Sequence, residues 1–228
     1  MKIIAKIHND FKEKFGIPRQ SGLSGELISK IVFEPEYRNP DALRGIDGYS
    51  HLWLIWQFSE AVREDWSPTV RPPRLGGNKR VGVFATRAPY RPNPIGLSSV
   101  KLERIEATAN EGTVLYISGA DLLDGTPIYD IKPYLAYVDS HPDATDGFAE
   151  NVRNYALKVA FCKELLSKID ISKQKSLIQI LEQDPRPSYQ NDPEREYGMR
   201  FADFEIFFKV DGESLTVTRV KTDCEAKK

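Results

Sequence analysis

Cysteine is almost absent from this 228-residue chain, and its scarcity narrows the kinds of site that the chain can hold. Cys162 and Cys224 stand far apart and form no CxxC pair, which argues against a disulfide framework and a cysteine-based zinc site. The three histidines follow no metal-binding spacing, so we expect no metal. No apolar run approaches the roughly 18 residues of a membrane span. Met1–Phe11 is too polar for a signal peptide, and we expect a cytoplasmic protein.

Two further absences concern the kind of ligand. No GxGxxG motif follows a strand-like run, so a Rossmann cofactor site is not indicated. Acidic residues are missing from Trp66 to Leu102, although the whole chain balances 32 basic against 33 acidic residues. That segment carries seven basic residues, namely Arg71, Arg74, Lys79, Arg80, Arg87, Arg91 and Lys101. A local field of one sign favours an anionic partner, and the pI near 6.3 confines such a role to this patch.

Within the basic segment lies GVFATRAPYRPNPIG, residues Gly82–Gly96. Solvated or ion-paired structural arginines are one interpretation of Arg87 and Arg91. The three prolines of the segment fix φ and remove backbone donors, so its polar side chains are presented with little loss of entropy on binding. We therefore favour a pre-organised binding loop.

The first two thirds of the chain show β patterns separated by turns. Alternation and apolar runs predict strands at residues 3–7, 27–33, 51–58, 80–85, 97–105 and 113–118. The 51–58 run is apolar on both faces, as expected of a strand buried in a closed sheet. Several short strands favour a barrel or sandwich. We expect a mainly β fold whose body, residues 1–145, is a closed β-barrel.

The pattern changes after about Asp146, and residues 146–228 are expected to form a small α+β appendage. One strand is predicted around residues 157–161, followed by helices at 163–169 and 173–182. Ser172 is the predicted N-cap of the second helix, and Asp184-Pro185 ends it. After a polar loop, two strands at 204–210 and 214–220 flank the hairpin turn Asp211-Gly212.

Three other segments carry candidate site residues. Ala120–Leu135 gathers Asp121, Asp124, Asp130 and Lys132 around a turn, and such carboxylates can hold ribose hydroxyls or cationic groups. For Asp124 alone, a local Asx-turn is the better interpretation. The exposed Pro18–Gln20 reads in isolation as an ordinary loop. Asp184–Tyr189 pairs an arginine with an aromatic residue, a combination that grips phosphate and stacks on RNA bases, but a helix terminator explains it equally well.

Taken together, five motifs resemble the TrmO (YaeB, TsaA-like) family across residues 3–220. The motifs are PRQSG (Pro18–Gly22), RPPRLGGN (Arg71–Asn78), GVFATRAPYRPNPIGLS (Gly82–Ser98), DLLDGTPIYDIKPY (Asp121–Tyr134) and DPRPSY (Asp184–Tyr189). The resemblance implies a homodimeric β-barrel enzyme that uses S-adenosylmethionine without a Rossmann fold. Its implied reaction is methylation at N6 of N6-threonylcarbamoyladenosine 37, beside the tRNA anticodon, with a threonine-type anticodon arm as partner.

Carried over by position, the resemblance implies a cofactor pocket made of Pro18, Arg19, Gln20, Ser59, Glu60, Arg87, Leu97, Asp121, Leu122, Leu123 and Asp124. The resemblance also implies that residues 146–228 contact the tRNA. From residue chemistry, Arg71, Arg74, Arg91 and Arg186 are expected to hold anticodon-arm phosphates, with Tyr189 also in the tRNA-binding set.

The acceptor nitrogen of threonylcarbamoyladenosine is urea-like and a poor nucleophile. General-base help is worth about 10²- to 10⁴-fold, and Asp130 or Tyr134 is our candidate base, with Asn93 orienting the adenine edge. The alternative is a non-catalytic barrel that binds S-adenosylmethionine or RNA as a sensor or adaptor, which the basic loop alone fits equally well. Turnover separates the two hypotheses.

Overall fold

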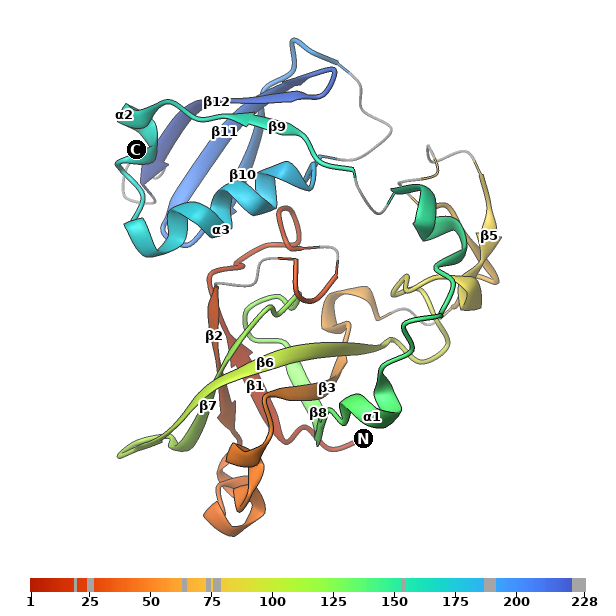
Figure 1. Ribbon diagram of the computed structural model, residues 1–228, viewed down its shortest axis with the longest axis vertical. Helices are drawn as coiled ribbons and strands as arrows, with labels where there is room; N and C mark the ends of the chain where they lie inside the picture. The colour runs from red at the N-terminus through yellow and green to blue at the C-terminus, as the bar shows by residue number, and fades with distance from the viewer. Residues whose placement is uncertain are drawn as a thin grey trace.

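The protein is described here by a computed structural model that covers residues 1–18, 20–23, 27–62, 65–72, 75, 79–152, 155–186 and 192–222. The fold is mainly β with few helices, as the sequence predicted. Figure 1 shows two stacked parts, a lower one built on a six-stranded sheet and an upper one built on a four-stranded sheet with two helices. The small β4 and β5 pair lies to one side.

The six-stranded sheet, called the main sheet below, comprises β1 (Ala5–His8), β2 (Ile28–Phe33), β3 (His51–Gln57), β6 (Ile95–Thr108), β7 (Gly112–Ser118) and β8 (Pro127–Pro133). The strands pair antiparallel in the order β1-β2-β7-β6-β3-β8. β8 also pairs with β1, where Ala5 lies opposite Ile128. Each strand of the main sheet therefore has a hydrogen-bonded neighbour on both sides.

Strict alternation along the strands sends one set of side chains into the core of the main sheet. On β3, Leu52, Leu54 and Trp56 are buried, whereas His51, Trp53, Ile55 and Gln57 are half-buried. β1 and β2 contribute further core residues from the same face, among them Ile7 and Ile31. The apolar outer face of β3 is therefore partly open, and it becomes one wall of the cavity described below.

The prediction of a strand at residues 80–85 is wrong for most of that segment. β5 covers Val81–Gly82 and pairs with β4 (Thr69–Val70), and a 3-10 turn, η6, follows at Val83–Ala85. The chain turns there because the carbonyl of Val83 accepts hydrogen bonds from Thr86 and Arg91, which draw the following loop back over it. A β-like local pattern was overridden by contacts with residues further along.

Three strands were not predicted at all, namely β4, β8 and β10. β8 lies in the Asp-rich segment that was interpreted as a turn carrying candidate site residues, and β10 (Tyr197–Phe201) lies where a polar loop was expected to end. β8 carries Asp130 and Lys132 among apolar residues, so its composition hides the strand. β10 has the burial pattern of an amphipathic strand, because Tyr197, Met199 and Phe201 are buried.

The four-stranded sheet, called the second sheet, comprises β9 (Lys158–Ala160), β10, β11 (Phe204–Asp211) and β12 (Ser214–Thr222). Its order is β10-β11-β12-β9, with β9 parallel to β12. The hairpin predicted at Asp211-Gly212 is confirmed, and Gly212 takes a positive φ of 55°. Helix α3 (Ile171–Glu182) buries Leu177, Ile180 and Leu181 in the same core.

The helix predictions in this region need two corrections. The first helix is short, with α2 covering Lys163–Leu166. The N-cap of α3 is Asp170, not Ser172, because the Asp170 carboxylate accepts a hydrogen bond from the Ser172 backbone N–H at 2.8 Å. A carboxylate at the N-cap also favours the positive end of the helix dipole. The predicted helix end is confirmed, since Asp184 follows with a φ of 53°.

The N-terminal segment between β1 and β2 belongs to both parts of the molecule. Phe11 and Phe15 pack in the core of the second sheet, with the Phe15 and Phe208 rings stacked at 6.4 Å. Asp10 accepts from Lys173 of α3 at 2.8 Å. The segment that carries Pro18 and Gln20 is therefore anchored against the second sheet as well as the main sheet.

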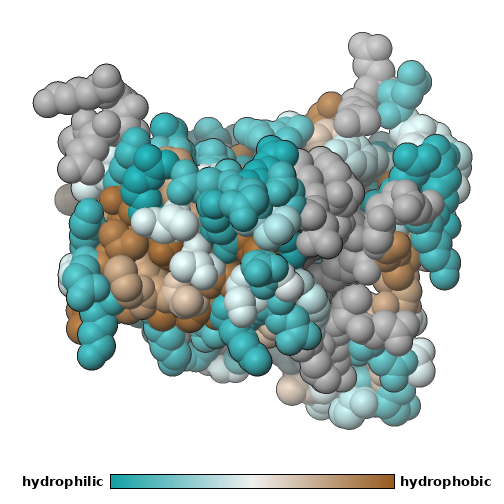
Figure 2. Space-filling model, turned by 90° about the horizontal axis from the view of Figure 1, so that it is seen from above, coloured by the Kyte–Doolittle hydropathy of each residue, from teal (hydrophilic) through white to brown (hydrophobic). Residues whose placement is uncertain are grey.

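Figure 2 shows the molecule from above, where hydrophilic residues cover most of the visible face and an apolar area lies at the left of the view. The remaining short elements include α1 (Ala136–Asp139) and the 3-10 turns η1 (Pro35–Tyr37), η2 (Pro40–Leu43), η3 (Ile46–Gly48), η4 (Ser59–Ala61) and η7 (Gly147–Val152). Among the helices that the structure describes, none is long and apolar enough to cross a membrane.

Candidate functional site

A cavity of about 1090 Å³ opens beside the main sheet. Five segments of the chain line it: residues 14–21, the outer face and end of β3 with η4, the loop 86–91, the start of β6, and the turn after β7 at 121–126. The residues around α1 close its far end. These segments are distant in sequence, so the main sheet brings the predicted loops together. In the described part of the chain, no cluster of His, Cys, Asp or Glu is arranged for a metal.

At one end of the cavity stands Asp121, which a hydrogen-bond chain orients. Trp56 Nε1 donates to Ser98 Oγ at 2.9 Å, and Ser98 Oγ donates to Asp121 Oδ1 at 2.5 Å. Ser98 is 1% exposed, so this chain runs through the interior of the main sheet. These hydrogen bonds satisfy the buried Trp56 N–H and the Ser98 hydroxyl, and they hold the Asp121 carboxylate in one orientation.

The electrostatics of Asp121 differ from those of a surface carboxylate. Burial raises the pKa of Asp121 above its ordinary value, because a charged carboxylate is poorly solvated there. The hydrogen bond from Ser98 and the charge of Arg87 work in the opposite direction without cancelling the effect. A cationic group of a ligand placed beside Asp121 would stabilise its ionised carboxylate.

Next to Asp121 the cavity wall is aromatic and closely packed. The Trp56 and Phe58 rings lie 4.3 Å apart between centroids, tilted by 59°. Gly96 of β6 lies against Trp56, and a Cβ at Gly96 would come 2.2 Å from the indole. Glycine is required at this position because any side chain would displace the Trp56 ring.

The proline-rich loop supplies two arginines with different tasks. Arg87 donates to Gln20 Oε1 and so joins the loop to the N-terminal segment across the cavity. Arg91 donates to the carbonyls of Thr86 at 2.7 Å and Val83 at 3.1 Å, and its guanidinium lies 5.6 Å from the Phe84 ring centroid. Arg91 therefore stabilises the turn from which Arg87 reaches into the cavity.

The other end of the cavity is an aromatic cluster beside α1. The Trp53 and Tyr134 rings lie 5.4 Å apart, and the His51 ring lies 6.2 Å from that of Tyr134. Asp139 accepts from Trp53 Nε1 at 3.0 Å and from the Leu135 backbone N–H at 2.9 Å. These two hydrogen bonds lower the pKa of Asp139, the one from Leu135 most.

Most of the predicted cofactor residues come together in this cavity. Its walls include Pro18, Gln20, Ser59, Glu60, Arg87, Leu97, Asp121 and Leu123. Leu122 is fully buried in the core of the main sheet, and Asp124 is turned toward Asn9 and Lys12. Arg19 lies outside the described residues. The assignment of these residues to a cofactor remains a prediction.

The three predicted catalytic residues are less closely grouped. Tyr134 lines the cavity. Asp130 lies on the outer face of β8 opposite Ile55, which in turn lies opposite Leu97, and its carboxylate is 2.8 Å from Lys132 Nζ. Asn93 is exposed on the proline-rich loop and does not line the cavity.

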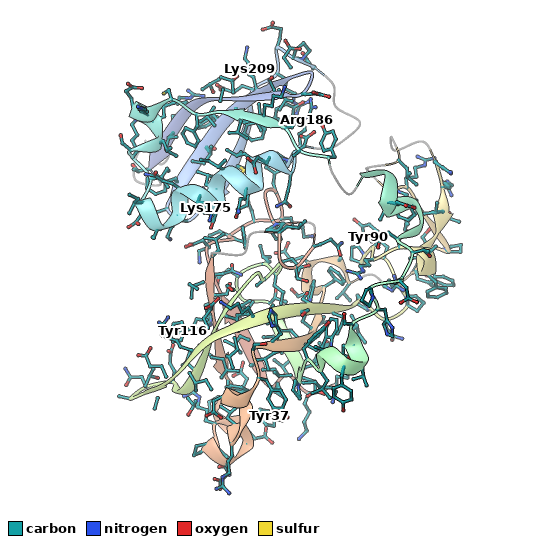
Figure 3. The ribbon with its side chains drawn as sticks, viewed as in Figure 1. Tyr37, Tyr90, Tyr116, Lys175, Arg186 and Lys209 are labelled. Atoms are coloured by element: carbon teal, nitrogen blue, oxygen red, sulfur yellow. The ribbon has the colours of Figure 1, made fainter. Side chains whose placement is uncertain are left out.

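The predicted tRNA-binding residues occupy different surroundings. Arg71 is exposed, and Arg91 lines the cavity. Arg186 is 7% exposed and donates to Asp184 at 2.9 Å, so its guanidinium lies in the interior. Figure 3 shows Arg186 in the part that holds the second sheet, while Tyr90 of the proline-rich loop lies beside the cavity segments. Arg74 and Tyr189 lie outside the described residues.

Sequence reasoning missed several residues of this site. Trp53, Trp56 and Asp139 lie outside the quoted motifs, and Ser98, the last residue of one of them, was not named as a site residue. These side chains meet only through strand pairing and the packing of α1. His51 also lines the cavity and contacts Ser50 Oγ through Nδ1 at 2.9 Å. The local signal available was Gly96, a glycine inside an otherwise continuous strand, which marks close approach of another group.

Fold and site together define a class: a β protein with a large composite cavity that has a buried carboxylate at one end and an aromatic cluster at the other. Family models identify the family. The tRNA-methyltransferase O N-terminal domain matches residues 6–140, and the TrmO C-terminal domain matches residues 154–223. The chain belongs to the TrmO family.

Relatives of known sequence and structure agree. A tRNA (adenine(37)-N6)-methyltransferase of Escherichia coli strain K12 is 40% identical over 215 residues, covering 91% of each chain. A putative S-adenosylmethionine-dependent methyltransferase of Pseudomonas aeruginosa is 42% identical over 211 residues, covering 89% of each. The crystal structure of TrmO from P. aeruginosa superposes with a TM-score of 0.77 at 34% identity, covering 96% of this chain and 95% of that one.

Proposed function

We propose that this protein is an S-adenosylmethionine-dependent tRNA methyltransferase that acts on N6 of adenine 37, beside the anticodon. The observation that carries the proposal is the composite cavity, in which residues of three of the five motifs converge on a buried carboxylate. Family membership and relatives of that activity support it.

The residues at the Asp121 end suit the cofactor. S-adenosylmethionine, when bound, supplies a methyl group on a positively charged sulfur and carries an ammonium and a carboxylate. Asp121 provides the negative charge for a cationic group, and Arg87 and Gln20 provide polar partners on the opposite wall. Trp56 and Phe58 give the apolar surface that a nucleoside base needs.

The acceptor side rests on the aromatic end. Tyr134 faces the cavity, so we propose that its hydroxyl contacts the acceptor base. Asp130 remains the candidate carboxylate for the proton of the acceptor nitrogen, because it stands in the same cross-strand row as Leu97 of the cavity wall. Neighbouring strands lie about 4.8 Å apart, which sets Asp130 roughly 10 Å from Leu97 across β3. Asn93 remains a candidate for orienting the adenine edge.

The RNA backbone is proposed to lie along the basic segment. Arg71 and Arg80 are exposed there, and no acidic residue stands between Trp66 and Leu102. Arg74, Arg91 and Tyr189 complete the proposed tRNA-binding set, with the C-terminal part as a second point of contact. Arg186 was predicted with them, but its guanidinium is buried against Asp184, so it could hold a phosphate only after leaving that ion pair. Because phosphate contacts release counterions, affinity for tRNA should fall steeply as salt rises.

Finer points belong to the same proposal. The substrate is proposed to be threonine-type tRNA that carries threonylcarbamoyladenosine, and the enzyme a cytoplasmic homodimer. The pairing of β8 with both β3 and β1 supports a closed β-barrel as the catalytic body. The proposed domain boundary near residue 145 is supported by the gap between the main sheet, which ends at Pro133, and the second sheet, which begins at Lys158.

The test is methyl transfer from labelled S-adenosylmethionine to tRNA. Transcripts with and without threonylcarbamoyladenosine at position 37 are compared, and the Asp130→Asn, Tyr134→Phe and Asn93→Ala variants are run beside the unaltered chain. Label in modified tRNA alone supports the activity and its substrate. Measurable cofactor binding without label in either tRNA would favour a sensor or adaptor instead.

A further inference from the structure

The aromatic end of the cavity has the composition of a base-binding surface. Trp53 and Tyr134 present rings 5.4 Å apart at an angle of 49°, and both side chains line the cavity while remaining half-buried. Aromatic rings that are partly exposed in a concave site are the groups on which splayed nucleic-acid bases stack. Neither the motifs nor the proposed cofactor set accounts for Trp53.

The cluster is held in place by polar contacts at its rim. The Trp53 indole is fixed through Nε1 by Asp139 Oδ2 at 3.0 Å, and the same oxygen accepts from the Leu135 N–H at 2.9 Å. The Tyr134 backbone N–H donates to the His51 carbonyl at 3.0 Å. A ring whose orientation is already fixed loses little entropy when a base stacks on it.

The position of the cluster separates it from the Asp121 end. Trp53 and Trp56 are three residues apart on β3, which corresponds to roughly 10 Å along the strand. The Trp56 and Phe58 pair already supplies an aromatic surface beside Asp121 and Arg87. At about 1090 Å³ the cavity lies at the upper end of the range of about 300–1,000 Å³ typical for ligand pockets. The cavity therefore carries two aromatic surfaces at different positions along its walls.

We propose that Trp53 and Tyr134 form the stacking platform for the target adenine of the tRNA, while the adenine of the cofactor uses the Trp56 end. The inference rests on the proposed function and names the subsite of its acceptor. Position 37 is unpaired in the anticodon loop, so turning its base onto the platform costs less than extracting a paired base. Asp139 is a positioning residue that acts through Trp53.

The test is a binding cycle with two anticodon stem–loop RNAs, one with threonylcarbamoyladenosine at position 37 and one abasic at that position. Affinities are measured for the unaltered chain, Trp53→Ala and Trp53→Phe, in the presence of saturating S-adenosylhomocysteine. Tyr137→Ala is the matched control, because Tyr137 is an aromatic residue of α1 that is 83% exposed and does not line the cavity. Affinity for S-adenosylmethionine is measured separately by calorimetry.

The unaltered chain and Tyr137→Ala should bind the adenine-containing RNA about tenfold or more tightly than the abasic RNA. Trp53→Ala should bind both RNAs equally, and Trp53→Phe should retain part of the difference. Cofactor affinity should stay within about twofold in all variants. If Trp53 had a purely structural role, Trp53→Ala would lower the affinity for both RNAs alike and leave the ratio of the two affinities unchanged. That result would overturn the inference.

Other outcomes also decide the matter. Loss of cofactor affinity in Trp53→Ala with an unchanged RNA ratio would assign the platform to the cofactor and refute the inference. An unaltered chain that transfers methyl groups yet shows no preference for the adenine-containing RNA would refute the platform alone. An unaltered chain that transfers no methyl group to modified tRNA would instead refute the proposed function.

Discussion

Asp121 and Asp124 stand three residues apart in one motif, yet they meet opposite environments. Asp121 faces the cavity, receives a hydrogen bond from Ser98, and has its pKa raised by burial. Asp124 lies outside the cavity lining. Partial burial tends to raise the pKa of Asp124, but hydrogen bonds from Lys12 and from the Asn9 N–H outweigh it, and the pKa is lowered.

The difference shows what each carboxylate does. Asp124 has its protein partners in place, with Lys12 Nζ at 2.8 Å, and it ties the turn after β7 to the N-terminal segment. Ionisation of the Asp121 carboxylate is costly in the buried site, and a nearby cation makes the ionised form favourable. We conclude that Asp124 stabilises the fold, and we propose that Asp121 is the carboxylate whose charge a bound ligand balances.

The largest expected effect comes from removing the charge that faces the cavity. Asp121→Asn should weaken S-adenosylmethionine binding about 30-fold or more, because a buried ionic partner of the ligand is lost. Asp124→Asn should change the same affinity less than about threefold. Calorimetric titration of both variants checks this, and equal losses would abolish the distinction between the two carboxylates.

A second effect concerns the aromatic wall beside Asp121. Gly96→Ala should displace Trp56, lower the free energy of unfolding by about 1–3 kcal/mol and also weaken cofactor binding. Gly82→Ala is the control, since a Cβ there meets nothing within 4 Å. Denaturant titration and calorimetry measure the two quantities. If Gly96→Ala had the same free energy of unfolding and the same cofactor affinity as the control, the Trp56 contact would not shape the site.

The hydrogen-bond chain behind Asp121 should also be measurable. Ser98→Ala leaves the buried Trp56 N–H without its acceptor, at a cost of about 1–3 kcal/mol in unfolding free energy. In a Trp56→Phe background the same substitution should cost clearly less, because the donor is gone. Denaturant unfolding of the single and double variants gives the coupling. Strict additivity would mean that Trp56 and Ser98 do not interact.

The smallest effect is the pH dependence of stability. Asp124 has a lowered pKa, so its contribution is present above its ordinary value near 3.9 and is lost as pH falls through the folded value. Asp121 has a raised pKa, so its contribution is present at low pH and is lost as pH rises through the folded value.

Two variants distinguish these opposite dependences of stability on pH. The destabilisation by Asp124→Asn, about 1 kcal/mol at neutral pH, should shrink below about pH 4. Asp121→Asn should gain stability relative to the unaltered chain as pH rises above that value. Thermal unfolding at a series of pH values provides the measurement, and parallel curves for both variants would contradict the assignment.

Much of the fold followed from local patterns. Strands at 27–33, 97–105 and 113–118, the hairpin at Asp211-Gly212 and the end of α3 were predicted because alternation and turn chemistry act over a few residues. The 80–85 segment was mistaken for a strand, since the Val83 carbonyl is bound by Arg91, eight residues further along. β8 was missed because its polar residues lie on a half-open face.

The site was predictable where motifs are contiguous and not where strands create it. Gln20, Arg87 and Asp121 were named from motifs, and all three line one cavity. Nothing local shows that Asp121 faces the cavity while Asp124 faces Lys12, because the choice depends on β1 lying beside the turn. Trp53 and Asp139 are 86 residues apart and meet only in the folded protein.

The central claim is that this cavity transfers a methyl group to tRNA. The most direct measurement follows label from S-adenosylmethionine into threonine tRNA with and without threonylcarbamoyladenosine, using the unaltered chain and Asp121→Asn. The account predicts label in the modified tRNA alone and its loss in the variant at subsaturating cofactor. Cofactor binding by the unaltered chain with no label in either tRNA would contradict it.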